Sequence, residues 1–292
     1  MNIKLIIMDM DGTLLDADSN ITKDNLDALI KAQQKGIRLV LASGRSYKSL
    51  LKYGKQLQMD KYNGYFVGVN GAAIYDCQND HNEVINQLNI EQIKDIFNEA
   101  LKYDIEVMGV LDDTIYDYIP ESLLKIKEDY RLNNNIAKDV PNTAGSFAIV
   151  TDQRKGYDHI YFINDVNEIK VKVNKICMAH LSDTIDKVYP SLAKSFEGKY
   201  HLAKTTSQWL ECTPLGINKG ETIVKLADRL NIKKDEMIVF GDGENDLSMF
   251  DVAGYAIAME NAMDSVKNRA YDITLDNNHD GIAYYLKKEN II

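Results

Sequence analysis

The first 70 residues alternate between continuous apolar runs and amphipathic stretches. The runs IKLIIM (3–8), IRLVLA (37–42) and YFVGV (65–69) are apolar throughout, which is typical of strands buried on both faces of a sheet. Between them, apolar positions recur at helical spacing over about 23–35 and 46–57. This alternation of strand and helix predicts a parallel sheet with right-handed crossovers, which is an α/β fold.

The pattern changes at about residue 83. From there to about residue 212 the expected strands are half-buried, as in an antiparallel sheet, with helices over 89–103 and near 183–198. We expect a hairpin turn at Asp112-Asp113 and a loop over 131–145. These features predict a small α+β module with an open antiparallel sheet.

After Gly216 the first pattern returns. A helix is expected over 219–230, and strands over 237–240, 256–259 and 272–275. We therefore predict one discontinuous α/β domain, residues 1–84 and 213–292, interrupted by an inserted α+β domain, residues 85–212.

Capping residues mark several expected helix boundaries. Thr22 is placed as an N-cap before the first helix, and Gly36 lies where a C′ glycine is favoured. Asn89 and Gln92 have the spacing of a capping box at the start of the helix over 89–103.

Composition narrows the possible functions. The chain of 292 residues carries a formal charge of −10, which argues against nucleic acid or an anionic membrane as a partner. Three cysteines without CxxC spacing indicate neither a disulfide framework nor a zinc site. No apolar run reaches the ~18 residues of a membrane span, so we expect a cytoplasmic protein. Nothing in the pattern indicates an oligomeric state.

Polar residues gather where the expected parallel strands end. The strand over 3–8 is followed by Asp9-Met10-Asp11-Gly12-Thr13, and the strand over 37–42 by Ser43-Gly44-Arg45. The strand over 237–240 is followed by Asp242, Asn245 and Asp246, and Lys219 begins the helix that precedes this strand. Asp and Gly are also ordinary turn residues, so each segment alone has a structural explanation. In an open parallel sheet, however, chemistry collects at the carboxyl ends of the strands.

Four segments together resemble a known family. DMDGTLL, ASGR, NKGETI and GDGENDLSM are similar, in order and spacing, to the four motifs of the haloacid dehalogenase-like hydrolases. The large insert between the second and third motifs resembles the C2 cap of Cof-type phosphatases in that family. The resemblance covers essentially the whole chain and implies a Rossmann-like core with an inserted α+β cap domain.

The resemblance implies roles for the acidic residues. Asp9 would be the nucleophile that forms an aspartyl-phosphate. Asp11 would protonate the departing alcohol and then take a proton from the attacking water. Carboxylates so close together repel, and Mg²⁺ held by Asp9, the carbonyl of Asp11 and Asp242 would offset that repulsion. Lys219 would add a positive charge beside the phosphate.

Other positions would contact phosphate or support the site. The resemblance implies phosphate contacts from Met10, Ser43, Gly44, Lys219 and Asn245. Thr13 either orients Asp9 or caps the turn. Asp246 either supports the metal or Lys219, or caps a helix. Arg45 is either a surface charge or a substrate contact.

The function that the resemblance implies is a Mg²⁺-dependent phosphatase of small phosphorylated metabolites, such as sugar phosphates or phosphorylated cofactors. Two alternatives use the same residues. A phosphomutase would keep the two aspartates but return the phosphoryl group to the substrate. A non-catalytic phosphate-binding regulatory module would bind without turnover.

Overall fold

The computed structural model describes the backbone of residues 1–292 and all side chains apart from that of Lys155. The chain divides into two compact units. The first comprises Met1–Ile85 and Ile217–Ile292, and the second comprises Asn86–Gly216. The second unit is therefore inserted, along the sequence, between the two halves of the first.

The first unit is built on an 8-stranded sheet with the order β14-β13-β12-β1-β2-β3-β4-β5. Neighbouring strands from β14 to β3 are parallel, whereas β3, β4 and β5 pair antiparallel. The strands are β1 (Leu5–Met8), β2 (Arg38–Ala42), β3 (Tyr65–Gly68), β4 (Ala73–Asp76), β5 (His81–Val84), β12 (Met237–Gly241), β13 (Tyr255–Ala258) and β14 (Asp272–Ile273). The predicted parallel α/β sheet is confirmed. The β4–β5 hairpin was not predicted, because β5 is half-exposed and lacks an apolar run.

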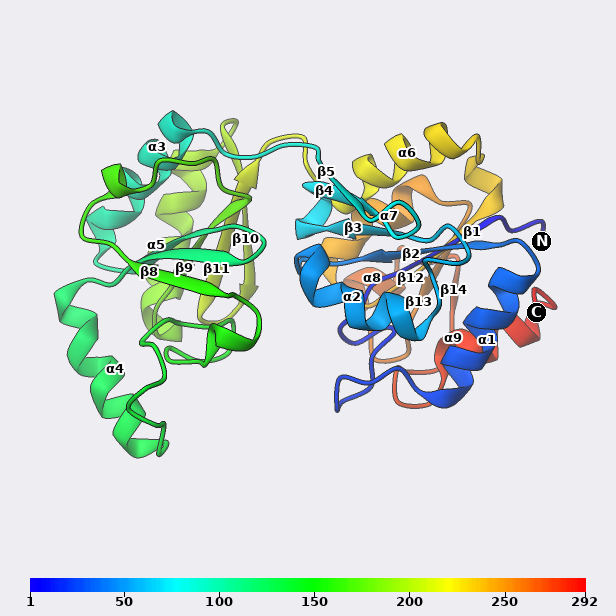
Figure 1. Ribbon diagram of the computed structural model, residues 1–292, viewed down its shortest axis with the longest axis horizontal. Coiled ribbons are helices and arrows are strands. Elements are labelled where there is room, and N and C mark those ends of the chain that lie inside the picture. Colours follow the sequence, from blue (N-terminus) through cyan, green and yellow to red (C-terminus); the bar gives the residue numbers. More distant parts are fainter. The chain divides into compact units, whose positions relative to one another are not determined.

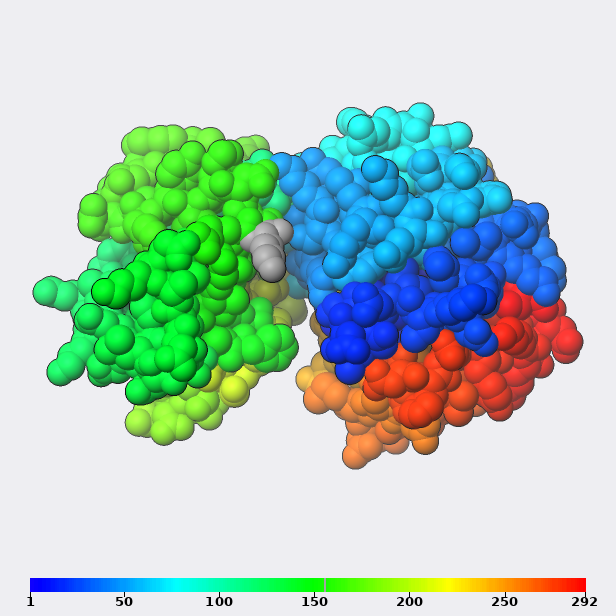
Figure 2. All heavy atoms as spheres, turned by 60° about the horizontal axis from the view of Figure 1, so that its bottom comes forward, coloured from blue at the N-terminus to red at the C-terminus, as the bar shows by residue number. Residues whose placement is uncertain are grey.

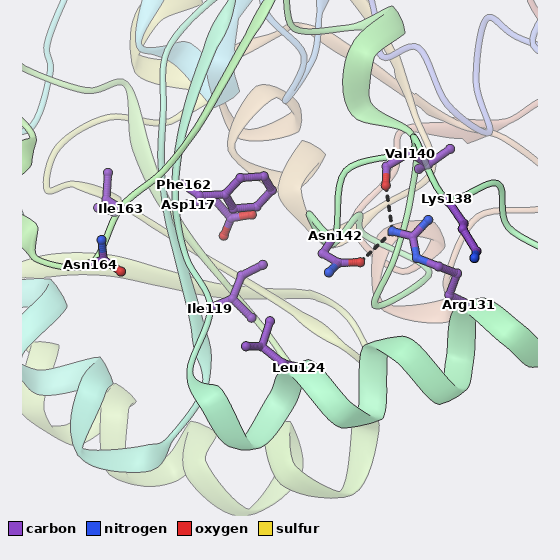
Figure 3. Close-up of a pocket in the computed structure, with 10 residues that line it drawn as sticks. All are labelled: Asp117, Ile119, Leu124, Arg131, Lys138, Val140, Asn142, Phe162, Ile163 and Asn164. Carbon is purple, nitrogen blue, oxygen red and sulfur yellow. Dashed lines mark hydrogen bonds between the residues drawn. The ribbon is translucent and has the colours of Figure 1, made fainter.

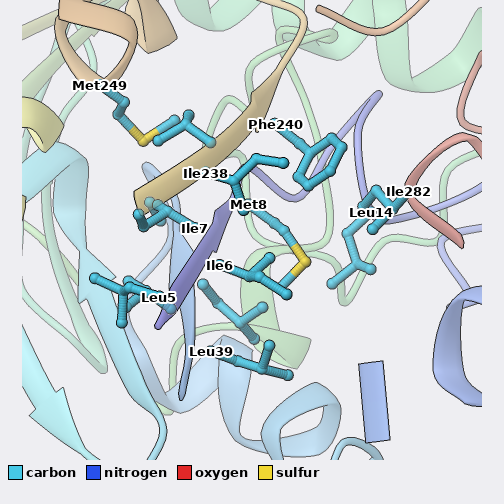
Figure 4. Packing of buried hydrophobic residues seen from close by; sticks show 14 of the residues in the cluster. Leu5, Ile6, Ile7, Met8, Leu14, Leu39, Ile238, Phe240, Met249 and Ile282 are labelled. Carbon is cyan, nitrogen blue, oxygen red and sulfur yellow. The ribbon is translucent and has the colours of Figure 1, made fainter. Parts of the chain in front are cut away.

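Strand β1 lies at the centre of this sheet and is the most completely buried element. Ile6 pairs with Ile238 on one side and Leu39 on the other, and all four residues of β1 are fully buried (Figure 4). Each such apolar side chain contributes roughly 1.5–3 kcal/mol by leaving water. This packing fixes the carboxyl ends of β1 and β12 next to each other.

Helices cover both faces of the sheet. Helix α6 lies above the sheet and α1 and α9 below it in the view of Figure 1. The N-terminal residues, in blue, and the C-terminal residues, in red, adjoin on the face that Figure 2 shows. The helices are α1 (Lys23–Gln34), α2 (Tyr47–Gln56), α6 (Lys219–Leu230), α7 (Leu247–Val252), α8 (Asp264–Lys267) and α9 (Gly281–Lys288).

Helices α6 and α7 pack at very short range. A Cβ at Gly220 would lie 2.0 Å from the carbonyl oxygen of Ser248, so a side chain there would force the helices apart. The Gly220 amide also donates to the Ser248 hydroxyl at 3.2 Å. This close approach fixes the start of α6, where Lys219 is located.

The second unit contains a 6-stranded sheet with the order β10-β11-β9-β6-β7-β8. Helices α3 and α5 share an apolar core with one face of it. Its elements are α3 (Ile90–Ala100), β6 (Glu106–Val110), β7 (Thr114–Tyr118), α4 (Glu121–Asn133), β8 (His159–Phe162), β9 (Lys175–Ala179), α5 (Ser182–Phe196), β10 (Tyr200–Thr206) and β11 (Trp209–Pro214). In the described part of the chain, no helix is long and apolar enough to cross a membrane.

Local predictions for the second unit were partly right. The hairpin at Asp112-Asp113 joins β6 to β7, and the capping box is present, with Asn89 and Gln92 bonded reciprocally at 3.0 Å. The sheet is not wholly antiparallel, however, since β7 and β8 are parallel. Helix α4 was not predicted, and the loop predicted over 131–145 begins too early because this helix extends to Asn133. That helix buries only Leu123 and Lys127, so its apolar stripe is weak.

Thr22 occupies the N-cap position of α1, but its side chain makes no capping hydrogen bond. Gly36 follows the helix with φ +89°, the left-handed conformation expected of a C′ glycine. The predicted boundaries of α1 are therefore close to the observed ones, although the cap at its start is made without the threonine hydroxyl.

Candidate active site

The candidate site lies at the carboxyl ends of β1 and β12 and at the start of α6. Asp9 directly follows β1, and Asp242 directly follows β12. Lys219 is the first residue of α6, and Asp246 ends the short 3₁₀ turn Glu244–Asp246. Because β1 and β12 are parallel neighbours, their ends meet at one edge of the sheet.

Lys219 is the centre of the buried charge network. Its ammonium group donates to Asp9 Oδ1 at 2.5 Å and to Asp246 Oδ1 at 2.7 Å, and its side chain is only 1% exposed. Asp9 and Asp246 are also buried. A buried lysine is rare unless it is paired, so these two contacts explain how its charge is accommodated.

Asp246 holds this arrangement from the far side. Its Oδ2 accepts hydrogen bonds from the backbone amides of Asp242 and Gly243, both at 3.1 Å. Although Asp246 occupies the N-cap position of α7, its side chain makes no capping bond to that helix. Of the two roles left open by the sequence, the contacts therefore favour support of Lys219 and of the 242–243 backbone.

Asp242 is oriented by the loop after β1. Thr13 donates from its hydroxyl to Asp242 Oδ1 at 2.7 Å. Gly12 adopts φ +80°, and a Cβ at this position would lie 2.4 Å from Asp242 Oδ2. Only glycine therefore allows the loop to turn this closely over the carboxylate. The Thr13 hydroxyl therefore holds Asp242, and not Asp9, which was the expected partner if Thr13 did more than cap the turn.

The electrostatics of the cluster are dominated by excess negative charge. Burial, together with the neighbouring Asp246, raises the pKa of Asp9 to about 8, although Lys219 opposes this shift. Burial also raises the pKa of Asp242 to about 6. For Lys219, burial favours the neutral form, but Asp246 and Asp9 outweigh it and raise the pKa above its usual range. One lysine is therefore not enough to neutralise three carboxylates.

The donor set fits a hard divalent cation. Oxygen atoms of Asp9, Asp242 and Asp246 all lie within 4.8 Å of one another. Oxygen donors of this kind suit Mg²⁺, and a second positive charge would relieve the repulsion just described. The Asp11 side chain, by contrast, does not belong to this group, so only its backbone carbonyl remains as the predicted donor.

Asp11 instead forms an ion pair with Arg45. The guanidinium group contacts both carboxylate oxygens: Nε donates to Oδ2 at 3.0 Å and Nη2 donates to Oδ1. The Asp11 side chain is 59% exposed. Arg45 is therefore neither an isolated surface charge nor, in this arrangement, free for a substrate, since it positions the predicted acid and base.

The predicted phosphate contacts occupy different environments. Ser43 is buried, and its hydroxyl accepts from the Arg45 amide at 3.1 Å, across Gly44. Met10 is fully buried in the core, and its carbonyl accepts hydrogen bonds from the amides of Leu14 and Leu15. Asn245 is exposed within the Glu244–Asp246 turn. The structure brings Asp9, Thr13, Lys219, Asp242 and Asp246 into one hydrogen-bonded cluster, and Met10, Ser43, Gly44 and Asn245 lie in its flanking loops.

Sequence reasoning gave no role to the turn after β3. Val69, Asn70 and Gly71 all have positive φ, which is unusual for a β-branched residue such as valine. The Asn70 amide donates to the Ser43 carbonyl at 3.0 Å, and the Thr222 hydroxyl donates to the Gly71 carbonyl at 2.6 Å. The turn thus connects the loop after β2 to helix α6. The Asn70-Gly71 pair is the sequence signal that marks it.

The site has carboxylates at the ends of the central parallel strands β1 and β12 and a buried lysine at the start of α6, the edge at which α/β proteins place their ligand and active sites. The chain belongs to the haloacid dehalogenase-like hydrolase family, whose family model matches residues 6–286. The resemblance inferred from the four motifs is therefore confirmed, and the protein is a hydrolase by family.

Individual relatives extend over the whole chain. The crystal structure of a haloacid dehalogenase-like hydrolase from Bacteroides thetaiotaomicron superimposes with a TM-score of 0.77 at 28% identity, over 98% of this chain and 99% of that one. Phosphatase YwpJ of Bacillus subtilis is 27% identical over 98% of this chain and 99% of its own. The B. subtilis 5-amino-6-(5-phospho-D-ribitylamino)uracil phosphatase YwtE is 27% identical, covering 97% of each chain.

Proposed function

We propose that the protein is a Mg²⁺-dependent phosphatase that hydrolyses small phosphorylated metabolites through an aspartyl-phosphate on Asp9. The observation that carries the proposal is the contact of the buried Lys219 with both Asp9 and Asp246, at 2.5 and 2.7 Å, where the central strands end. Family membership and relatives named as phosphatases support the same activity.

Asp9 is the proposed nucleophile. One of its carboxylate oxygens forms a bond to phosphorus while the bond from phosphorus to the ester oxygen breaks. Lys219 holds Asp9 Oδ1 and so fixes the orientation of the carboxylate. The lysine also places a positive charge beside the transferring group, where negative charge develops.

Asp11 is the proposed acid and base. It gives its proton to the departing alkoxide, and it then takes a proton from the water that attacks the phosphorus of the aspartyl-phosphate. That attack releases inorganic phosphate and restores the Asp9 carboxylate. Arg45 contacts both Asp11 oxygens, so this pair must open or shift when Asp11 approaches the ester oxygen.

Asp9, Asp242 and the carbonyl of Asp11 are the proposed ligands of Mg²⁺, which when bound would offset the charge of the carboxylates and of the phosphate dianion. Thr13 holds Asp242 in place, and Asp246 holds Lys219. Ser43, Gly44, Asn245 and the Met10 amide are proposed to bind the phosphate oxygens.

The second unit, predicted from the sequence as residues 85–212, is the proposed cap that selects the leaving group. Sugar phosphates and phosphorylated cofactors are the proposed substrate classes. YwtE, by its name, acts on a phosphate ester of a ribitylamino-uracil. Such a compound belongs to the same class of small phosphorylated metabolites.

Replacement of the nucleophile tests the proposal. Asp9→Asn should reduce hydrolysis of p-nitrophenyl phosphate in the presence of Mg²⁺ by at least about 1,000-fold, because loss of a nucleophile removes the covalent route. Asp18→Asn, at an exposed position of the same unit, is the matched control and should retain activity. Activity of Asp9→Asn within threefold of the wild type would refute the assignment.

Replacement of Asp242 tests the metal ligands. Asp242→Ala should raise the Mg²⁺ concentration for half-maximal activity by at least about tenfold, since loss of even an indirect contact to a metal costs 10- to 100-fold. Glu244→Ala removes an exposed carboxylate two residues away and should leave that concentration unchanged. If both variants need the same Mg²⁺ concentration for half-maximal activity, Asp242 is not a ligand of the metal.

A further inference from the structure

Two asparagines from the C-terminal part of the chain hold the loop that follows β1. The side-chain amide of Asn261 donates to the Gly12 carbonyl at 2.8 Å, and that of Asn277 donates to the Leu15 carbonyl at 2.7 Å. The backbone amide of Asn277 donates to Asn261 Oδ1 at 3.2 Å, which connects the two asparagines and directs Asn261 Nδ2 to Gly12. The asparagines lie 249 and 262 residues beyond the carbonyls that they hold, so these contacts exist only in the folded first unit.

The Gly12 carbonyl depends on such a partner for its orientation. Gly12 has φ +80° and lies too close to Asp242 for any side chain, so this position has to be glycine. Glycine, however, restrains its own backbone less than any other residue. Its neighbours are Asp11, whose carbonyl is a proposed ligand of Mg²⁺, and Thr13, whose hydroxyl holds Asp242. The hydrogen bond from Asn261 therefore fixes a peptide between two residues of the candidate active site.

The segment that carries Asn261 also contacts the loop after β12. It follows β13, which pairs in parallel with β12. The backbone amide of Met263 donates to the Asp242 carbonyl at 3.1 Å. Residues 261–263 thus contact the loop after β1 through Asn261 and the loop after β12 through Met263. These two loops carry all the proposed ligands of Mg²⁺.

The two asparagines differ in burial. Asn277 is buried, whereas Asn261 is exposed although both polar atoms of its side chain are bonded within the protein. Loss of an exposed hydrogen bond leaves groups that water can reach, so its effect on stability is small. Replacement of Asn261 can therefore alter the loop without unfolding the unit, which replacement of Asn277 would risk.

A bridge of the same kind in the second unit serves packing. Arg131 on α4 donates to the Val140 carbonyl and to the Asn142 side chain, both at 2.6 Å, beside a hollow of about 300 Å³ (Figure 3). The carboxylate cluster that fits a metal lies in the first unit instead. A side chain that holds a loop carbonyl thus need not serve a reaction. Asn261 is distinguished by the residues on either side of the carbonyl that it holds.

We propose that Asn261 is a positioning residue for the magnesium site. It fixes the peptide after Gly12, and through it the Asp11 carbonyl and the Thr13 hydroxyl that orients Asp242. This inference rests on the proposed function. Without Asn261 the same ligands are present, but the distance between the two loops is no longer held. Mg²⁺ requires near-ideal octahedral geometry, whereas Ca²⁺ accepts flexible geometry, so Mg²⁺ binding is the more sensitive to this loss.

Calorimetric titration of the full chain with Mg²⁺ and with Ca²⁺ tests the proposal without relying on turnover. Asn261→Ala should weaken Mg²⁺ binding about tenfold, the lower end of the range for residues that act through a metal ligand, and Ca²⁺ binding by less than about threefold. Asn278→Ala is the matched control. This exposed asparagine accepts from the Ala17 amide at 3.0 Å, farther along the same loop, and its loss should leave both affinities unchanged.

Three results would overturn the proposal. The first is absence of Mg²⁺ binding to the wild type, and the second is equal Mg²⁺ affinity in Asn261→Ala and Asn278→Ala. The third is an equal loss of Mg²⁺ and Ca²⁺ affinity in Asn261→Ala, or its failure to fold, because either would make Asn261 a structural residue. If the wild type binds Mg²⁺ but does not hydrolyse p-nitrophenyl phosphate, the proposed function is refuted, whereas the affinities still decide the role of Asn261.

Discussion

Two buried charge clusters in this protein each combine one lysine with several carboxylates, but the hydrogen-bond partners of the lysine differ between them. In the first unit, Lys219 contacts Asp9 and Asp246, with Asp242 beside them. In the second unit, Lys127 contacts Glu106, with Asp117 nearby. In both, carboxylates outnumber the lysine. Only the first has carboxylate oxygens from three positions converging within 4.8 Å.

The difference lies in what surrounds each lysine. Lys127 donates to two backbone carbonyls, those of Asn142 and Ile149, which hold it inside the second unit. Lys219 donates to two carboxylates instead, and these come from segments more than 200 residues apart along the chain. Excess negative charge at the open end of a parallel sheet favours a divalent cation, and a bound cation would in turn attract a phosphate. Excess negative charge inside the packed second unit favours a proton on one of its two buried carboxylates.

Removal of Lys219 should have the largest effect on stability. Lys219→Ala leaves the three carboxylates without their cation, and loss of one partner of a buried pair typically costs about 3–5 kcal/mol. Unfolding by urea at pH 8, followed by circular dichroism, measures this loss. Lys225→Ala, exposed on the same helix, should change the free energy of unfolding by less than about 0.5 kcal/mol. Equal stabilities would show that the cluster tolerates its excess charge unaided.

Removal of Asp117 should instead stabilise the folded protein at neutral pH. Its pKa rises from the usual 3.8 to about 6 in the folded protein. A raised carboxyl pKa stabilises the fold below about pH 4, and this contribution is lost as pH rises to about 6, by roughly 3 kcal/mol in total. Asp117→Asn should therefore be more stable than the wild type at pH 7 by up to that amount, and less so at pH 5.

Fluorescence of Trp209 can report this change. It is the only tryptophan of the sequence and is buried in the second unit, so urea unfolding of that unit can be followed separately. Asp129→Asn, at an exposed position of α4, is the control. A loss of stability in Asp117→Asn that is equal at pH 5 and pH 7 would mean that the carboxylate makes contacts of its own.

The pair between Arg45 and Asp11 should matter least for stability. Because the pair is partly exposed, Arg45→Gln should change the free energy of unfolding by less than about 1 kcal/mol. Arg229→Gln breaks a comparable exposed pair with Glu83 and is the control. Only Arg45→Gln should also lower kcat for p-nitrophenyl phosphate. Unchanged kcat in both variants would remove Arg45 as a positioning residue.

Much of the fold of the first unit follows from the sequence. The run LIIM is buried on both faces, so continuous apolar letters predicted β1 correctly. Once the parallel strands were assigned, the rule that strand ends meet at one edge placed Asp9 near Asp242. The structure brings these residues together with Lys219, Thr13 and Asp246.

The second cluster could not be predicted in the same way. Periodicity treats Glu106 and Lys127 as surface positions, because charged residues are seldom buried. Their burial depends on contacts between β6, α4 and the loop at Asn142, which are distant in the sequence and carry no common motif. The helix that carries Lys127 was partly assigned to a loop for the same reason. The contact of Arg45 with Asp11 could not be predicted either, because it depends on how the loops after β1 and β2 approach each other.

The most direct test of the central claim is chemical trapping of the phosphorylated aspartate. In Asp11→Asn, p-nitrophenolate can still leave unaided, but activation of the attacking water is impaired, so the aspartyl-phosphate should accumulate. Borohydride reduction of the quenched protein followed by peptide mass spectrometry should then show homoserine at position 9. Homoserine at another aspartate, or a burst of p-nitrophenol without any reduced residue, would contradict Asp9 as the acceptor of the phosphoryl group.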